Sequence, residues 1–167
     1  MRIRAGGEAD IDAILAMGDE AVEWMVSRGN TGQWGTKPWS QTPSRRESTT
    51  LIVRETDVWI AELDGEPVGV LATGDKPGPY VPLVDEPEVY VRLLMTSRRH
   101  AGKKIGSQLL DKAVAIAREQ GVSLVRVDCY AGGTGELVRY YERNGFVKSE
   151  TFTALTYWPG QVLSRRI

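Results

Sequence analysis

Histidine and cysteine are almost absent from this chain, in which His100 and Cys129 are the single residues of their types. One cysteine excludes an internal disulfide and a cysteine-rich zinc site, and one histidine argues against a histidine-based metal site. No apolar run reaches the roughly 20 residues of a membrane-spanning helix. The first four residues have the character of a strand and not of a signal peptide. We therefore expect a cytoplasmic protein without a metal site and without a membrane partner.

An excess of charge of either sign is missing as well. Lysine and arginine number 21 against 22 aspartates and glutamates, which gives a formal net charge of −1. Such a balance offers no electrostatic reason to expect a nucleic acid as partner. The hydrophobic share of 41% and the charged share of 26% are those of an ordinary globular protein. No linker or repeat divides the chain, so we expect one domain over residues 1–167.

Hydrophobic periodicity and turn residues predict a chain that mixes strands and helices. The expected strands are residues 1–4, 58–63, 67–73, 89–96, 122–130, 146–155 and 162–167. The expected helices are residues 11–25, 43–54, 105–120 and 136–143. This order predicts an α/β (α+β) fold, in which a layered sheet has helices on its faces. The β-α-β unit around residues 105–120 should be parallel and right-handed.

An anion site is predicted between the strand 89–96 and the helix 105–120. The residues from Ala101 to Ser107 are A-G-K-K-I-G-S. Glycines let the backbone approach a ligand closely, and the start of a helix presents unpaired N–H groups at the positive end of its dipole. Lys103 and Lys104 add positive charge, so a pyrophosphate fits this segment. The alternative is an ordinary glycine-containing turn with solvated lysines, which the spacing alone does not exclude.

Two stretches of the chain resemble the signature motifs of the GCN5-related N-acetyltransferase (GNAT) superfamily. The first, Tyr90 to Leu110, is similar to a strand and loop followed by Gln/Arg-x-x-Gly-x-Gly/Ala at the start of a helix. Gly106 matches the second glycine, but Ala101 replaces the usual Gln or Arg and Lys104 replaces the first glycine. The second, Leu137 to Phe146 (L-V-R-Y-Y-E-R-N-G-F), resembles the Tyr-Glu-x-x-Gly-Phe motif. The resemblance covers nearly the whole chain, and the order of elements agrees with it.

The resemblance implies a mixed, mostly antiparallel sheet of about seven strands with helices on both faces. It also implies transfer of an acetyl group from acetyl-CoA to the primary amine of a small molecule. The pyrophosphate contacts fall to Ala101, Gly102, Lys103, Lys104, Gly106 and Ser107. The backbone N–H of Leu94 would polarise the thioester carbonyl, while Met95 and Thr96 pair with the pantetheine like an added strand. Arg98 or Arg99 would compensate for the missing Gln or Arg.

Tyr141 is the expected general acid, because the resemblance places its hydroxyl near the cofactor sulfur, where it can protonate the departing thiolate. The alternative is that Tyr141 only packs against Leu137, one helical turn earlier. Cys129 raises the option of a covalent acyl-enzyme route. A small buried strand residue is the better interpretation of this cysteine, since the family usually transfers the acyl group directly.

The general base is assigned by strand alternation. Glu88, Tyr90 and Arg92 lie on one face of the strand 89–96 and its approach, because side chains alternate along a strand. Some family members carry a glutamate at the position of Tyr90, and Glu88 lies one step further out on the same face. We therefore expect Glu88 to be the base. Asp85, Glu86 or a chain of water molecules remain alternatives.

The resemblance implies that the first two helices and the loop between them form the acceptor wall, and this loop holds Trp34 and Trp39. Tyr80, in the proline-rich loop 75–87, and Tyr90 complete the expected substrate-binding set. Aromatic rings and nearby carboxylates suit a cationic acceptor with an apolar portion. The alternative is that the tryptophans fill a core. Peptide N-termini, polyamines, aminoglycosides and amino acids all remain open as acceptors.

Other functions compete with that of a small-molecule N-acetyltransferase. A degenerate domain that binds acyl-CoA as a sensor or scaffold is favoured by Ala101, by Lys104 and by Gly132–Thr134, where the family often has a cofactor-binding Asn. An acetyltransferase that acts on proteins or tRNA is a further alternative, although the neutral charge does not favour tRNA. A P-loop is excluded because Gly-x-x-x-x-Gly-Lys-Ser/Thr does not occur. A homodimer is common in the family, but no feature of this sequence shows one.

Overall fold

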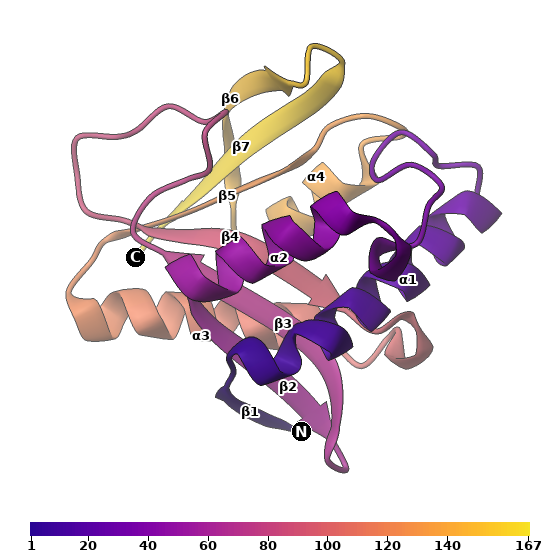
Figure 1. The fold of residues 1–167 in the computed structure, drawn as a ribbon. Helices are drawn as coiled ribbons and strands as arrows, with labels where there is room; N and C mark the ends of the chain where they lie inside the picture. Colours follow the sequence, from indigo (N-terminus) through magenta and orange to yellow (C-terminus); the bar gives the residue numbers. More distant parts are fainter.

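The computed structural model describes all 167 residues and contains one seven-stranded sheet with α-helices on both faces (Figure 1). The strands are β1 (Arg2–Ala5), β2 (Asp57–Leu63), β3 (Glu66–Gly74), β4 (Val89–Thr96), β5 (Leu124–Tyr130), β6 (Val147–Ala154) and β7 (Trp158–Arg166). Their order in the sheet is β1-β2-β3-β4-β5-β7-β6. Only β4 and β5 are parallel. The expected mixed, mostly antiparallel sheet is therefore confirmed.

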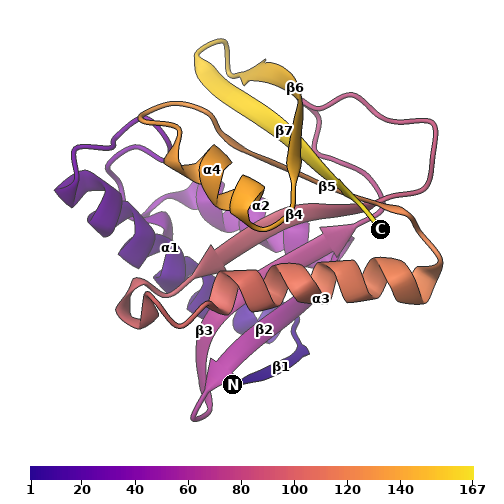
Figure 2. The same cartoon turned by 180° about the vertical axis from the view of Figure 1, so that it is seen from behind.

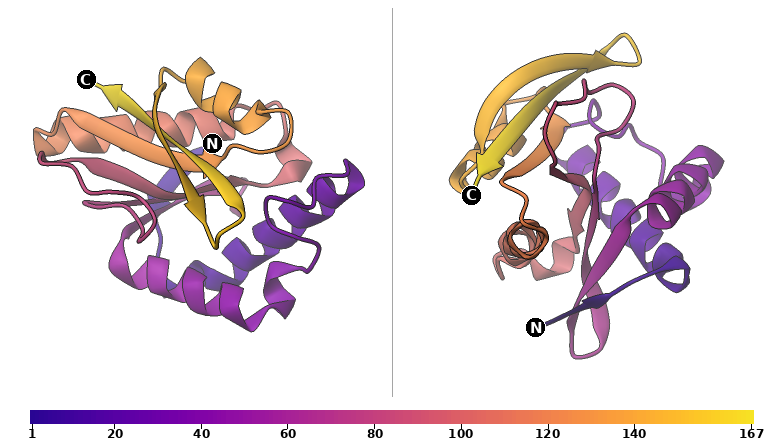
Figure 3. Two further views of the ribbon diagram at one scale, coloured as in Figure 1. Left: turned by 90° about the horizontal axis from the view of Figure 1, so that it is seen from above. Right: turned by 90° about the vertical axis from the view of Figure 1, so that its left-hand side faces the viewer.

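Four α-helices cover the sheet, two on each face (Figures 2 and 3). They are α1 (Ile11–Ser27), α2 (Pro43–Glu55), α3 (Ile105–Gln120) and α4 (Glu136–Arg143). Helices α1 and α2 enclose one hydrophobic core with the sheet, and α3 and α4 enclose the other. Strand β3 serves both cores by alternation, because Val70 and Ala72 pack toward α1 and α2 while Leu71 packs toward α3. None of these helices combines the length and the apolar character needed to cross a membrane.

The last strand differs from its sequence-based prediction. Residues 162–167 were expected to form it, but β7 begins at Trp158, and Pro159 pairs with Thr153 of β6. The hairpin turn lies earlier, at residues 155–157, where Leu155 and Thr156 have positive φ angles. Pro-Gly is a common turn signal, but here Pro159 lies within β7, and its carbonyl accepts the N–H of Ala131. The extension brings Trp158 to the end of the sheet where the candidate site lies.

A glycine in α1 lets Trp39 reach this end of the molecule. Trp39 lies in a short 3₁₀ turn before α2, and its buried ring packs directly on Gly18. A Cβ atom on Gly18 would overlap the indole ring. The glycine therefore fixes how deeply Trp39 packs between α1 and the sheet.

We expect Gly18→Ala to lower the free energy of unfolding by about 1–3 kcal/mol, because the added methyl group overpacks the Trp39 ring. An alanine inside a helix ordinarily stabilises by about 1 kcal/mol relative to glycine. Ala16→Gly, at an exposed position of the same helix, gives that intrinsic value by urea denaturation. If Gly18→Ala instead raises the free energy of unfolding by as much as Ala16→Gly lowers it, Trp39 does not constrain this position.

Candidate active site

The site is built where the two parallel strands separate. Strands β4 and β5 pair only over Val89–Val91 and Val125–Val127, although both continue for several residues beyond. The register between β3 and β4 shifts at the same point and leaves Arg92 without an opposite residue. Such a β-bulge bends its strand and increases the local twist. The carboxyl ends of β4 and β5 therefore diverge and open a gap in the sheet.

A cavity of about 370 Å³, here called the splay cavity, fills this gap. Its lining comes from β4 (residues 91–96), β5 (residues 127–130), α1, α2, the α1–α2 loop, Leu137 and Tyr141 of α4, and Trp158. Most of the lining is hydrophobic, and its charged members are Arg45, Arg92, Arg98 and Asp128. An apolar cavity with a few charged groups is the usual form of a small-molecule site.

The backbone of β4 presents donors to the gap. The N–H of Ser97 donates to the carbonyl of Val68 on β3 at 2.8 Å. Backbone direction alternates along a strand, so the N–H of Met95 also faces β3, whereas those of Leu94 and Thr96 face the open side. Leu94 and Thr96 thus have the orientation that the sequence analysis expected of them. Met95 differs, since its backbone faces β3 and its side chain is buried in the core below α1.

The predicted phosphate loop joins the end of β4 to α3. Residues 101–104 are exposed, and Gly102 and Lys104 adopt left-handed conformations with φ angles of 85° and 56°. This is the conformation that glycine adopts most easily, so Lys104 occupies a position suited to the glycine it replaces. No side chain caps the start of α3, which leaves the first N–H groups of the helix available to an anion.

Arg98 is the free arginine of the pair that precedes this loop. Arg99 is engaged by two carboxylates, those of Glu20 and Glu66. Arg98 has no carboxylate partner and stacks over the Trp24 ring at 3.7 Å. Burial, and next the charge of Arg28, lower the pKa of Arg98. Its side chain borders both the splay cavity and another cavity, of about 680 Å³, that leads toward α4. Arg28 and Arg143 also line this other cavity.

Tyr141 lines the splay cavity from α4 and also packs in the core. Its ring meets Phe146 edge-on at 6.0 Å, and its hydroxyl makes no hydrogen bond within the chain. Burial holds the pKa of Tyr141 well above its usual value of 10.0, so the phenol stays protonated at neutral pH. Cys129 also borders the cavity, but burial raises its pKa to about 12. A protonated thiol is a poor nucleophile, which favours the structural interpretation of this cysteine.

The structure does not support Glu88 as the base. Glu88 accepts two hydrogen bonds from Arg126, from Nε at 2.6 Å and from Nη2 at 2.8 Å. Both side chains are buried, and neither lines the splay cavity. The partner of Glu88 is 38 residues away in sequence, so strand alternation alone could not show that this carboxylate is already paired. Arg126 also donates to the carbonyl of Pro82 and lies 3.5 Å from Glu150.

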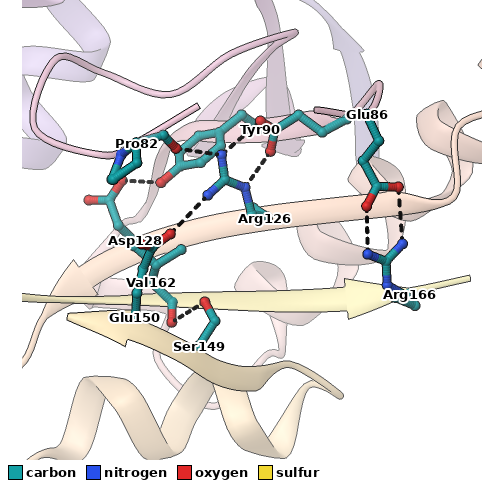
Figure 4. Close-up of polar contacts among 10 residues, drawn as sticks. Pro82, Glu86, Tyr90, Arg126, Asp128, Ser149, Glu150, Val162 and Arg166 are labelled. Carbon is teal, nitrogen blue, oxygen red and sulfur yellow. Dashed lines mark hydrogen bonds and ion pairs between the residues drawn. The ribbon is translucent and has the colours of Figure 1, made fainter. Parts of the chain in front are cut away.

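Asp128, on β5, is the carboxylate that reaches the cavity, and the sequence analysis did not name it. Its Oδ2 accepts the hydroxyl of Tyr90 at 2.6 Å (Figure 4). Burial raises the pKa of Asp128 above its ordinary value of 3.8, although the Tyr90 hydrogen bond and then Arg92 and Arg126 oppose the rise. One signal was present in the sequence: Arg126 and Asp128 alternate in an otherwise apolar strand, which indicates a charged face inside the molecule.

Three of the four expected aromatic residues line two cavities that share part of their lining. Trp39 lines the splay cavity, and Trp34 lines both that cavity and a second one of about 540 Å³ under the β6–β7 hairpin. Tyr80 lines only the second cavity, which is here called the hairpin cavity. Tyr90 lines neither and instead lies behind Asp128. The indole N–H of Trp158 donates to the carbonyl of Gln33 at 2.8 Å and so joins the hairpin to the α1–α2 loop.

A mixed sheet that splits between two parallel strands, with an uncapped helix start at the end of the first, defines the class of acyl-CoA N-acyltransferase folds. The family model described as "Acetyltransferase (GNAT) family" matches residues 19–146. The chain therefore belongs to the GNAT family of acetyltransferases.

Solved structures share this fold at low sequence identity. A ribosomal-protein-alanine N-acetyltransferase from Brucella melitensis superposes with a TM-score of 0.69 at 21% identity, over 100% of both chains. The PaiA N-acetyltransferase from Thermoplasma acidophilum, solved with coenzyme A, gives 0.72 at 16% identity over 99% of this chain and 98% of that one. YncA from Salmonella typhimurium, solved with its cofactor acetyl-CoA, gives 0.66 at 19% identity over 99% and 93%. A search of curated protein sequences finds no significant match.

Gly106, in the first turn of α3, lies under Tyr140, whose hydroxyl a Cβ atom at this position would overlap. We expect Gly106→Ala to weaken coenzyme A binding at least about tenfold, or 1.4 kcal/mol, because the methyl group obstructs the uncapped N–H groups. The measurement is isothermal titration calorimetry with coenzyme A.

The double variant Gly106→Ala, Tyr140→Phe separates the two roles of this glycine. Removing the Tyr140 hydroxyl relieves the overlap, so the stability lost in Gly106→Ala should largely return. Coenzyme A affinity should stay low if the glycine serves the ligand. Recovery of affinity together with stability would mean that Gly106 only accommodates Tyr140 and that no phosphate binds at this turn.

Proposed function

We propose that this protein is an acetyl-CoA-dependent N-acetyltransferase that acts on the primary amine of a small molecule by direct attack on the thioester. The observation that carries the proposal is the composition of the splay cavity. The free N–H of Leu94, the protonated hydroxyl of Tyr141 and the carboxylate of Asp128 border the same space. These are the three groups that acyl transfer to an amine requires: an oxyanion donor, an acid and a base.

The chain fits acetyl-CoA by its unpaired groups. A pantetheine arm carries amide groups that can pair with the open edge of β4 at Leu94 and Thr96. A pyrophosphate fits the uncapped start of α3, with Gly102, Lys103, Lys104, Gly106 and Ser107 around it. Arg98 supplies a guanidinium group without a carboxylate partner beside both cavities. The presence of coenzyme A or acetyl-CoA in two structures of the same fold supports this assignment.

Each residue then has a defined task. Bound acetyl-CoA supplies an activated acyl group. Asp128 attracts the acceptor ammonium group and accepts its proton, and a pKa raised by burial brings this carboxylate closer to the working pH. The N–H of Leu94 donates to the carbonyl oxygen as negative charge develops there. Tyr141 donates its proton to the departing thiolate, a role that needs the protonated form that burial maintains.

Wild-type protein should bind acetyl-CoA in a calorimeter and release free thiol when an accepted amine is added. Tyr141→Phe should bind acetyl-CoA with unchanged affinity, since the hydroxyl makes no hydrogen bond in the chain, while kcat falls about 100-fold or more. Unchanged kcat would remove the acid role. Tight binding by the wild type without thiol release, over a library of amines, would favour a sensor or scaffold.

Tyr90→Phe should shift the acidic limb of the kcat/KM profile to higher pH. The Tyr90 hydroxyl stabilises the ionised form of Asp128, so its loss raises the pKa of that carboxylate further. A hydrogen bond to a charged group contributes about 1.5 kcal/mol or more, which corresponds to a shift of about one pH unit. Asp128→Asn should abolish the limb and most of the turnover. An acidic limb that stays in place in both variants would exclude Asp128 as the base.

A further inference from the structure

The hairpin cavity, under β6 and β7, has two charged residues in its lining. Arg45 and Asp128 border it together with the aromatic rings of Trp34, Tyr80, Phe152, Tyr157 and Trp158. Both charged residues also border the splay cavity. A molecule that enters through the hairpin cavity toward the thioester position therefore meets one cationic and one anionic side chain on an aromatic wall.

Arg45 projects from the first turn of α2, and its guanidinium group has no anionic partner. The group stacks over the Trp39 ring at 4.9 Å and makes no hydrogen bond or ion pair within the chain. Burial lowers the pKa of Arg45. Its neighbour Arg46 is exposed and pairs with Asp12 at 3.1 Å. A partly desolvated guanidinium without a counter-ion is unfavourable on its own, and an incoming carboxylate would relieve that cost.

Arg45 and Asp128 are not paired with each other, so each is available to a separate group of one ligand. The hydrogen bond that Asp128 receives comes from Tyr90, and the arginines that act on its pKa are Arg92 and Arg126. Arg92 borders only the splay cavity and lies near the carboxylate that receives the amine. Arg45 is thus the cation of the hairpin cavity.

We propose that the acceptor is an amino acid or a close analogue, a small molecule that carries a carboxylate beside its primary amine and an apolar side chain. Asp128 receives the ammonium group, Arg45 binds the carboxylate with two parallel N–H donors, and the rings of Trp34 and Tyr80 contact the apolar portion. This inference rests on the proposed function and names the acceptor class of the same site.

The test compares matched pairs of amines that differ by one carboxylate: L-phenylalanine with 2-phenylethylamine, and L-methionine with 3-(methylthio)propylamine. Wild-type kcat/KM should favour the amino acid of each pair by at least about tenfold. Arg45→Gln should lower kcat/KM for the amino acids about 100-fold, mainly through KM, and lower it far less for the simple amines, so that the preference for the amino acid of each pair is lost. Arg45→Lys keeps the positive charge but loses the two parallel N–H donors. Its kcat/KM for the amino acids should therefore lie between those of the wild type and Arg45→Gln. Arg46→Gln, one residue along and outside both cavities, should match the wild type.

Equal use of both members of each pair, unaffected by Arg45→Gln, would overturn the inference and leave the proposed function standing. A preference for succinyl-CoA over acetyl-CoA that Arg45→Gln abolishes, with no discrimination between paired amines, would also overturn the inference, because the anion would then belong to the donor, and it would replace acetyl-CoA in the proposed function. Failure to acetylate any amine would refute the proposed function. Calorimetry of L-phenylalanine and 2-phenylethylamine with the coenzyme A-loaded protein would still decide the acceptor class: tighter binding of the acid that is lost in Arg45→Gln supports it, and equal binding contradicts it.

Discussion

The early end of pairing between β4 and β5 is the constraint on which the site depends. A buried backbone group needs a hydrogen-bond partner, and inside a sheet that partner is normally the next strand. Here the bulge at Arg92 turns β4 away after three paired residues, so the donors of Leu94 and Thr96 face a space instead of β5. A ligand with amide groups of its own can take the place of the missing strand. The arrangement that weakens the sheet locally is therefore also the one that creates a binding edge.

Two side-chain contacts hold β4 and β5 together just before they diverge. Tyr90 and Arg126 are register partners on these strands. Arg126 binds Glu88, which directly precedes β4. Tyr90 of β4 binds Asp128 further along β5 (Figure 4), so two successive positions on one face are cross-linked. A buried ion pair adds little net stability over apolar packing, whereas loss of one partner costs about 3–5 kcal/mol. Its value here is positional, since it fixes the register from which Asp128 reaches the cavity.

The sequence predicted the fold more completely than it predicted the candidate site. The strong period of residues 105–120 with Gly121 after it, and the Asp64-Gly65 turn, locate their elements because local backbone preferences decide them. The start of β7 was missed because Pro159 is held in the strand by its pairing with Thr153 and its hydrogen bond from Ala131. Both partners lie outside its own segment. Asp128 was missed as a candidate base, where Glu88 was expected, for the same reason. Both carboxylates alternate onto a buried face, and only the position of Arg126 in space shows which of them is neutralised.

Under the proposed function, the site has a donor side and an acceptor side that are built from different parts of the chain, and this separation has a functional consequence. The donor side consists of β4, the following loop, α3 and Tyr141 of α4, which are the segments that carry the family motifs. The acceptor side consists of the α1–α2 loop, the first turn of α2 and the β6–β7 hairpin, joined by the Trp158–Gln33 hydrogen bond. Asp128 belongs to both, because it lies on β5 at the junction of the two cavities. Changes in Arg45, Trp34 or Tyr80 can therefore alter which amine is admitted without disturbing Leu94 or Tyr141.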